Sequence, residues 1–316
     1  MKKRLFSVVV PVCNEADSLE RLYRELCTVF ESVPYEPEFI FVDDGSTDAS
    51  PHILQQLSVG DTRVKYIQFS RNFGKEAATS AGLSYARGDA ALMIDADLQH
   101  PPQLIPEFIE KWEEGAEIVV GIRRPRAAES FLRRTGSRMF TAIMNMIGDS
   151  YAPQGSTDFR LLDAAIIKAF RAFTERGRMT RALIDWLGFK RAYIHFDAAE
   201  RSDGSARYRY GGLARLALTT IVAHSRLPLR LAGYLGALII FLAGCLGLFV
   251  IIEQFMLGDP LHIEVSGTAM LAIMILFLNG IVLVSLGLMS LYIGTIHEET
   301  MHRPLFVVRR ILNIEE

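Results

Sequence analysis

Residues 92–102 read LMIDADLQHPP, an apolar run that ends abruptly at two aspartates, Asp95 and Asp97. A short apolar run bounded by polar residues and prolines is typical of a strand buried in a sheet. Magnesium and manganese ions prefer oxygen ligands and are usually held by one or two carboxylates together with substrate phosphates. The stretch therefore predicts a buried strand with a divalent-cation site at its carboxyl end. Helix caps or loop acids are the alternative for a single D-x-D.

The residues around this stretch predict further strands and helices in alternation. Apolar runs stand at 5–12 (LFSVVVPV), 38–42 (EFIFV), 64–70 (VKYIQFS) and 116–120 (AEIVV), and we expect Pro11 to stop the first of them. Between them, apolar residues recur at helical spacing, as at Leu19, Leu22 and Leu26. Strands that alternate with helices predict an α/β fold with a mainly parallel sheet.

Polar residues follow three of these strands at the point where each strand ends. They are Asn14 and Glu15, then Asp43 and Asp44, then Asp95 and Asp97. In open parallel sheets, ligands bind beyond the carboxyl ends of the strands, where carboxylates can accept hydrogen bonds from a nucleotide. The three strand ends together predict a nucleotide and metal site.

Two long segments in the C-terminal third, residues 231–252 and 265–296, have no charged side chain. A bilayer core of about 30 Å requires about 20 apolar helical residues, so each segment can span it. Arginines precede the first segment and follow the second, whereas the sequence between them, EQFMLGDPLHIEVSG, has no Lys or Arg. The positive-inside rule then places both termini in the cytoplasm. Residues 210–229 alternate basic and apolar side chains and predict an interfacial helix.

Length and cysteine usage agree with this division. The chain has 316 residues, which suits about two domains. Cys13, Cys27 and Cys245 are scattered without the spacing of a metal site or a disulfide framework, as expected in a reducing cytoplasm. The start of the chain, MKKRLF, leads into an apolar run too short for a signal peptide.

Motifs in a fixed order resemble the family-2 inverting glycosyltransferases of GT-A fold. They are VVVPVCNE, VDDGSTD, NFGKEAATSAGL, GDAALMIDADLQHPP and DFRLLD. More narrowly, the chain resembles the polyprenyl-phosphate glycosyltransferases of the dolichol-phosphate-mannose-synthase-like group, above all the bacterial branch with two C-terminal spans. That branch includes polyprenyl-phosphate glucosyltransferases, and the likeness extends to YIGTIHEETMHRPLFVV near the C-terminus. It implies inverting transfer of a sugar, with glucose from UDP-glucose expected, to a polyprenyl phosphate at the cytoplasmic membrane face.

The resemblance also implies roles for individual residues. The nucleotide-sugar site would comprise Pro11, Glu15, Asp43, Asp44, Asp95 and Gln99. The Mg²⁺ or Mn²⁺ ligands would be Asp95, Asp97 and Gln99. The acceptor phosphate would be bound by Arg123, Arg133, Ser137, Arg207 and Tyr208. The catalytic residues would be Asp158, Asp97 and Arg201, the last in a loop that closes over the donor.

The acceptor chemistry limits what Asp158 has to do. A phosphomonoester has a second pKa near 6, so the attacking oxygen is already ionised at neutral pH. We therefore expect Asp158 to orient or act electrostatically first, and as a base second. The basic segment 123–138 would bind the phosphate through bidentate arginines, although a solvated run of charges is the alternative. Four positions depart from the family pattern, namely Cys13 for Tyr, His100 for an acid or amide, Ala206 for Ser, and Arg207 for Lys, which keeps the charge.

We expect four parts in the chain. They are a cytoplasmic GT-A domain (1–200), a donor loop with interfacial helices (201–230), a two-helix transmembrane hairpin (231–296) and a cytoplasmic tail (297–316). The expected partners are the nucleotide sugar, the bilayer, the lipid acceptor and further copies in a homo-oligomer such as a tetramer, with no nucleic acid. The lipid would be undecaprenyl phosphate in a bacterium and dolichyl phosphate otherwise.

Other functions remain open on the residues alone. GDP-mannose or a UDP-linked amino or formamido sugar could be the donor. A processive polysaccharide synthase would share the N-terminal fold, but the chain has no Q-x-x-R-W motif. A membrane-tethered regulatory protein that binds a nucleotide without turnover is the alternative outside the enzymes, and Asp158 and Arg201 argue against it.

Overall fold

The computed structural model describes residues 4–124, 153, 155–175, 179–197, 238, 241, 245 and 267–314. The chain divides into two compact units. One, here called the sheet unit, comprises Met1–Ala206 and Arg303–Glu316, and the other comprises Arg207–His302. The sheet unit is therefore built from two separate parts of the sequence.

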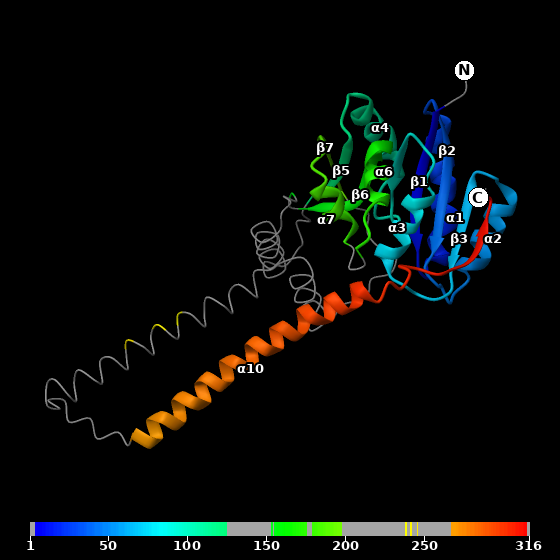
Figure 1. Cartoon of the computed structure of the whole chain (residues 1–316). Helices are drawn as coiled ribbons and strands as arrows, with labels where there is room; N and C mark the ends of the chain where they lie inside the picture. The colour runs from blue at the N-terminus through cyan, green and yellow to red at the C-terminus, as the bar shows by residue number, and fades with distance from the viewer. Residues whose placement is uncertain are drawn as a thin grey trace. The chain divides into compact units, whose positions relative to one another are not determined.

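An eight-stranded sheet forms the centre of the sheet unit, in the order β7-β5-β6-β4-β1-β2-β3-β8 (Figure 1). The strands are β1 Arg4–Val12, β2 Tyr35–Asp43, β3 Val64–Phe69, β4 Ala90–Met93, β5 Ile118–Arg123, β6 Ser156–Asp163, β7 Arg191–Phe196 and β8 Val308–Leu312. Strands β4, β1, β2 and β3 run parallel, as do β5 and β7. β6 is antiparallel to β4 and β5, and β8 is antiparallel to β3. The predicted mainly parallel α/β sheet is confirmed.

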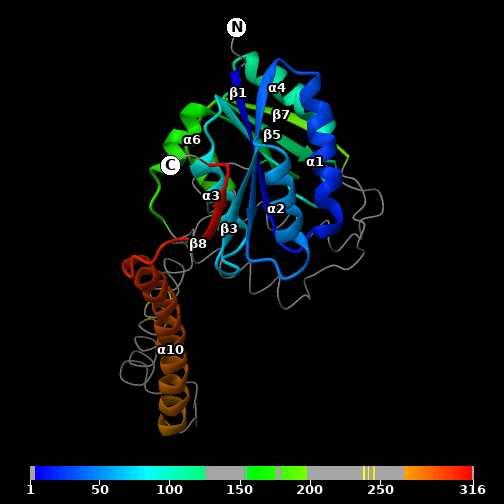
Figure 2. The same cartoon turned by 90° about the vertical axis from the view of Figure 1, so that its right-hand side faces the viewer.

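Helices cover both faces of this sheet (Figure 2). One face carries α1 Ala16–Glu31, α2 Ser50–Gly60, the short 3-10 helix η1 Pro102–Leu104 and α4 Ile105–Glu113, and the other carries α3 Lys75–Tyr85, α6 Ala164–Arg171 and α7 Thr180–Trp186. Successive residues of a strand point to opposite faces, so Val8 and Val10 pack into the core under α1 while Val9 packs under α3. Strands buried on both faces read as continuous apolar runs, which is why the sequence signal was clear.

Strand β1 continues through Pro11, contrary to the expectation that Pro11 would end it. Pro11 pairs in register with Val42 of β2. On the other side, the last β4 contact is made by the N–H of Ile94, which donates to the carbonyl of Val9. Odd-numbered residues of β1 therefore turn their backbone polar groups toward β4, and β4 has ended before it reaches Pro11. The missing N–H costs no ladder hydrogen bond there.

The C-terminal residues return to the sheet as the edge strand β8. Beside it, the ring of Phe306 stacks on Phe69, with ring centres 5.0 Å apart and planes 10° apart. The Asn313 side-chain amide donates to the carbonyl of Val64 at 2.9 Å and also to that of Ser58. These residues were expected to form a cytoplasmic tail, and the strand was not predicted.

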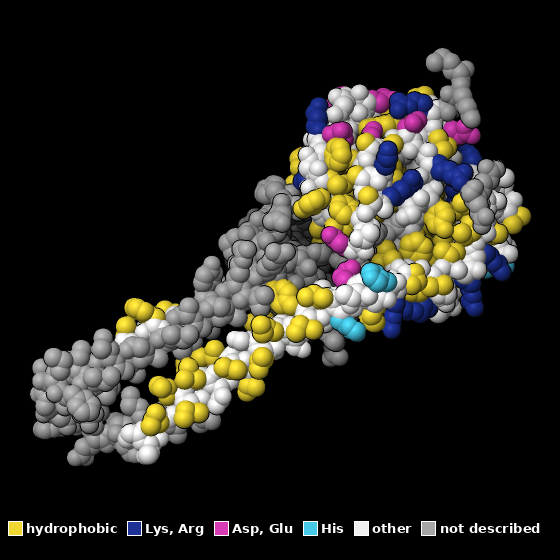
Figure 3. Space-filling view, viewed as in Figure 1, with side chains coloured by type: hydrophobic (Ala, Val, Ile, Leu, Met, Phe, Trp, Pro, Cys, Tyr) yellow, Lys and Arg dark blue, Asp and Glu magenta, His cyan; other side chains and the backbone are white. Residues whose placement is uncertain are grey.

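Helix α10, Gly267–Thr300, makes up most of the described part of the second unit, which also includes Met301, His302 and three single helical residues, Leu238, Phe241 and Cys245. Within the described residues, one helical segment, Phe277–His297, is long and apolar enough to cross a membrane, and its most apolar window has no buried residue. Apolar side chains line this helix (Figure 3). It contains most of the predicted segment 265–296. The rest of segment 231–252 lies outside the described residues, so the two-helix hairpin stays a prediction.

Candidate active site

The loops that follow β1 and β2 are held together by hydrogen bonds. The side-chain oxygen of Asn14 accepts the backbone N–H of Thr47 at 2.8 Å. In return, the backbone N–H of Asn14 donates to the hydroxyl of Ser46 at 3.0 Å. Asn14 adopts a left-handed conformation, with φ of 56°, which asparagine tolerates better than most residues. Two of the three predicted strand ends therefore form one rigid edge.

Asp43 and Asp44 are both buried and both hold neighbouring loops. Asp43 accepts the N–H of Ser46 at 2.8 Å and the hydroxyl of Tyr66 at 3.3 Å. Asp44 accepts the N–H groups of Phe73 and Gly74, at 2.6 and 2.9 Å. Burial raises the pKa of Asp44, and these two backbone hydrogen bonds oppose that shift. Asp44 thus fixes the loop after β3, a role that the sequence analysis did not predict.

Gly45 explains why the loop after β3 can come so close to the loop after β2. A Cβ atom at Gly45 would lie 2.5 Å from the carbonyl carbon of Arg71 and 2.6 Å from the nitrogen of Asn72. The φ of Gly45 is +67°, which other residues rarely adopt. The glycine of VDDGSTD therefore permits a direct backbone approach between two loops.

The predicted metal ligands lie in a compact turn after β4. The carboxylate of Asp97 accepts the N–H of Gln99 at 3.1 Å. The Nδ1 atom of buried His100 accepts the N–H of Asp95 at 3.2 Å, and its ring stacks on Phe159 of β6 at 5.0 Å. Burial lowers the pKa of His100, in keeping with a neutral ring that accepts a hydrogen bond. His100, which had no assigned role, holds Asp95 in place.

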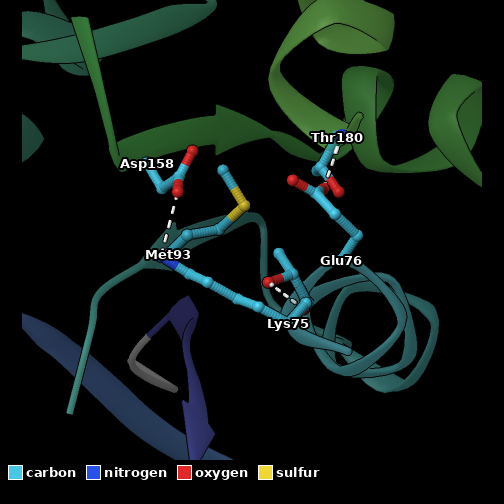
Figure 4. A pocket seen from close by; sticks show the side chains of 6 residues that line it. Lys75, Glu76, Met93, Asp158 and Thr180 are labelled. Carbon is cyan, nitrogen blue, oxygen red and sulfur yellow. Dashed lines mark hydrogen bonds and ion pairs between the residues drawn. The ribbon is translucent and has the colours of Figure 1, made fainter. Parts of the chain in front are cut away.

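Lys75, the first residue of α3, brings two predicted site residues together. Its ammonium nitrogen lies 2.9 Å from a carboxylate oxygen of Asp158 on β6 (Figure 4). It also lies 2.6 Å from a carboxylate oxygen of Asp95. Burial alone would raise the pKa of Asp158, but the positive charges of Lys75 and Arg181 hold it at about 2. Burial likewise acts to lower the pKa of Lys75, and the two carboxylates reverse that effect and raise it. The lysine stands in the motif NFGKEAATSAGL, but no local pattern around it predicts a role.

Lys75 and Asp158 line a small pocket between α3, β4 and the start of α7 (Figure 4). Its other lining residues are Glu76, Thr79, Met93 and Thr180. A carboxylate oxygen of Glu76 accepts the N–H of Thr180 at 2.7 Å. This hydrogen bond ties α3 to α7 across the pocket.

A buried ion pair supports the strand that carries Asp158. Arg160 is fully buried and donates to Asp185 of α7 at 2.9 Å and to the hydroxyl of Ser156 at 2.8 Å. A buried charge is tolerated only when it is paired and hydrogen-bonded, as this guanidinium is. The positive charge of Arg160 also contributes to the low pKa of Asp158.

The turn after β4 has the chemistry that a divalent cation requires. Asp95 already faces a cationic group, Lys75, and Asp97 lies two residues away with a second carboxylate. Among the described residues, no group of three or more His, Cys, Asp and Glu side chains could hold a metal. The ligand set implied by the resemblance, Asp95, Asp97 and the amide of Gln99, stays a prediction. Magnesium sites of this type are completed by substrate phosphates and water.

The remaining predicted residues divide into those near this edge and those outside the description. Pro11 and Glu15 lie at the end of β1 and just after it, and the N–H of Glu15 donates to the hydroxyl of Ser50 at 3.0 Å. Arg123 is the last residue of β5 and is partly exposed. The others lie outside the described residues, namely Arg133, Ser137, Arg201, Arg207 and Tyr208.

Residues 7–183, more than half of the chain, match the sequence profile of the family described as glycosyl transferase family 2. The chain belongs to this family. It is therefore a glycosyltransferase, and the family predicted from the ordered motifs is confirmed.

Similar proteins extend over nearly the whole length of this family-2 member. It is 37% identical over 309 residues to the uncharacterized glycosyltransferase sll0501 of Synechocystis sp., covering 98% of this chain and 96% of that protein. It is 35% identical over 303 residues to the bactoprenol glucosyl transferase of Shigella phage SfV, covering 96% and 97%. Among solved structures, mannosyl-3-phosphoglycerate synthase from Rubrobacter xylanophilus superposes with a TM-score of 0.50 at 17% identity, covering 73% and 75%. That likeness concerns the fold, and the expected GT-A fold is confirmed.

Proposed function

We propose that this glycosyltransferase moves a glucosyl group from UDP-glucose to a polyprenyl phosphate at the cytoplasmic face of a membrane, with inversion at the anomeric carbon. The observation that carries the proposal is the similarity over 96% of the chain to a bactoprenol glucosyl transferase. The cluster of Lys75, Asp95 and Asp158, at the edge of the sheet where the parallel strands end, supports the proposal as a place for the reaction.

The donor would bind along the edge formed by the loops after β1, β2 and β4. Pro11, Glu15, Asp43 and Asp44 would hold the nucleotide part. Asp95, Asp97 and Gln99 would hold Mg²⁺ or Mn²⁺ against the diphosphate. When bound, that cation supplies positive charge that stabilises the departing diphosphate.

The transfer forms one bond and breaks another without a proton transfer. An oxygen of the lipid phosphate bonds to the anomeric carbon, and the electron pair of the bond to the donor diphosphate leaves with the nucleoside diphosphate. The phosphate needs no base, because its second pKa lies near 6. Asp158, whose pKa is about 2, remains a carboxylate and favours the positive charge that develops on the sugar.

The acceptor would approach from the membrane side. Arg123, Arg133 and Ser137, with Arg207 and Tyr208, would bind its phosphate, and Arg201 would close over the donor. A helix able to cross a membrane, α10, suits an enzyme whose acceptor is a lipid. Arginine offers the bidentate hydrogen bonds that a phosphate dianion accepts.

The experiment measures sugar transfer to undecaprenyl phosphate in detergent from a panel of labelled donors, comprising UDP-glucose, GDP-mannose and UDP-linked amino sugars. It is run with Mg²⁺, with Mn²⁺ and with EDTA, for the wild type and Asp97→Ala. We expect labelled lipid from UDP-glucose that requires the cation and is lost in the variant. Product from another donor would correct the sugar, and nucleotide binding without lipid product from any donor would favour a regulatory protein.

A further inference from the structure

Lys75 contacts Asp95, one of the residues that would hold the divalent cation in the proposed function, on which this inference rests. Its ammonium group lies between Asp95 and Asp158 and contacts both. We propose that Lys75 is a positioning residue that acts as a built-in counter-cation: it holds Asp95 while the donor site is empty and is displaced from Asp95 when cation and donor diphosphate bind together.

The backbone of Lys75 is fixed, whereas its side chain can leave. The preceding Gly74 is held by Asp44, and the following Glu76 is tied to Thr180. The side chain of Lys75 is 45% exposed, and those of Asp95 and Asp158 are 26% and 34% exposed. Solvent and an incoming ligand can therefore reach this ion pair. A lysine ammonium on a flexible four-carbon stem can change partners without moving the backbone.

The charge balance of the site explains why a counter-cation is needed. Asp95 comes from the turn after β4 and Asp158 from β6, and both contact the same ammonium group. Without a cation these carboxylates would repel each other and Asp97 nearby. A metal ion that binds alone must displace Lys75 from Asp95 and gains little charge neutralisation in return. A metal ion that arrives with a diphosphate brings negative charge, to which the released ammonium can turn.

A purely structural ion pair is the competing explanation. Exposed ion pairs typically contribute little to stability. Two of the elements that Lys75 joins already have another connection, because His100, in the turn after β4, stacks against Phe159 of β6. The two explanations differ in what they predict for metal binding in the absence of donor. If the ion pair is purely structural, the metal ion should bind equally well or more weakly when Lys75 is replaced.

The experiment measures Mn²⁺ binding to the purified full-length protein in detergent, without nucleotide, from the electron paramagnetic resonance signal of free Mn²⁺. We expect Lys75→Met to bind Mn²⁺ about tenfold or more tightly than the wild type, since a competing positive charge is gone. Lys75→Arg keeps the charge and should keep the weak binding. Lys111→Met removes a lysine of α4 that is paired with Glu114, and it should leave Mn²⁺ binding unchanged.

Two additions make every outcome decisive. Lys75→Gln keeps a hydrogen-bond donor without charge and should show the same tighter binding, also where Lys75→Met fails to fold. In saturating UDP, the Mn²⁺ affinities of the wild type and the variant should lie closer together, because the released ammonium can turn to the diphosphate. Equal or weaker Mn²⁺ binding in the folded variants overturns the counter-cation proposal, even where the wild type transfers sugar. Absence of lipid product in the transfer assay overturns the proposed function instead.

Discussion

At the scale of single residues, the ionisation of Asp158 decides how it can take part in the reaction. Its pKa of about 2 lies below the ordinary value because Lys75 and Arg181 outweigh the effect of burial. A group with a lowered pKa is ionised above that value and loses its charge only as the pH falls through it. Asp158 is therefore a carboxylate at every pH at which the enzyme can be assayed, and a weak base throughout.

We expect Asp158→Asn to lower kcat by about 100-fold, the usual cost of removing one electrostatic contact to a transition state. The acid limb of the rate profile should stay near pH 6 in both proteins, because it reports the second ionisation of the acceptor phosphate. The prediction is tested by measuring initial rates of sugar transfer between about pH 5 and pH 9 for the wild type and Asp158→Asn. Asp197→Asn, which changes an exposed aspartate after β7, serves as the control. An acid limb that disappears in Asp158→Asn would instead identify Asp158 as the base.

The residues of the site were predictable to different degrees. Asp95 and Asp97 follow an apolar strand, and that local pattern was enough to identify them. Lys75 and His100 could not be identified in this way, because their importance depends on which loops meet in space. Lys75 reaches Asp158, 83 positions along the chain, and His100 stacks on Phe159, which comes from an antiparallel strand.

At the scale of elements, the loops after β2 and β3 behave as one unit that places the start of α3. Asp44 binds the loop after β3 through two backbone N–H groups, and Gly45 allows the two backbones to touch. Lys75 begins α3 directly after this loop. The position of the lysine therefore depends on residues of the VDDGSTD motif that do not contact it.

We expect Gly45→Ala to destabilise the protein by about 1–3 kcal/mol, from the strained left-handed backbone alone. The clash with Arg71 and Asn72 should add to the loss of unfolding free energy and should also shift α3. The rate of sugar transfer should therefore fall even at temperatures at which the variant stays folded. Gly60→Ala is the matched control, because a Cβ atom there meets nothing within 4 Å. Thermal melting and transfer rates measured side by side test the prediction, and equal behaviour of the two variants would contradict it.

Among the strands, β1 to β5 were predicted from their apolar runs, whereas β6, β7 and β8 were not. The central residues of β1 and β2 form nearly continuous apolar runs because both faces of these strands are covered. β8 reads VRRIL, and its two arginines are exposed, so its sequence resembles a charged tail. It becomes a strand because β3 offers an unpaired edge and because Phe306 packs on Phe69.

At the scale of the whole molecule, the sheet unit is interrupted by the unit that contains α10. Residues Met1–Ala206 supply seven strands of the sheet, and Arg303–Glu316 supply β8. The apolar segment is thus an insertion between two strands of the same sheet. Removing the C-terminal residues would damage the sheet unit itself.

We expect a fusion of residues 1–206, a flexible Gly/Ser linker and residues 303–316 to melt about 5 °C above residues 1–206 alone. The gain in melting temperature comes from the hydrogen bonds between β8 and β3 and from the Phe306 contact. In a domain of this size, each kcal/mol of added unfolding free energy raises the melting temperature by about 2–4 °C. Tryptophan fluorescence on heating measures it. The same fusion with Phe306→Ser should lose part of the gain, and a fusion that melts no higher than the short fragment would contradict the prediction.

Because β8 follows α10 in the sequence, it is synthesised after the seven strands that it joins in the sheet. The nascent protein exposes seven strands and then α10 before the last strand is made. Until that moment β3 has an open edge of unpaired N–H and C=O groups. The N–H of Ser70, at the start of the loop that leads to Lys75, also lacks its hydrogen-bond acceptor until then, because that acceptor is the carbonyl of Val307. A nascent chain that has not yet reached β8 therefore contains the apolar helix α10 but an unfinished sheet.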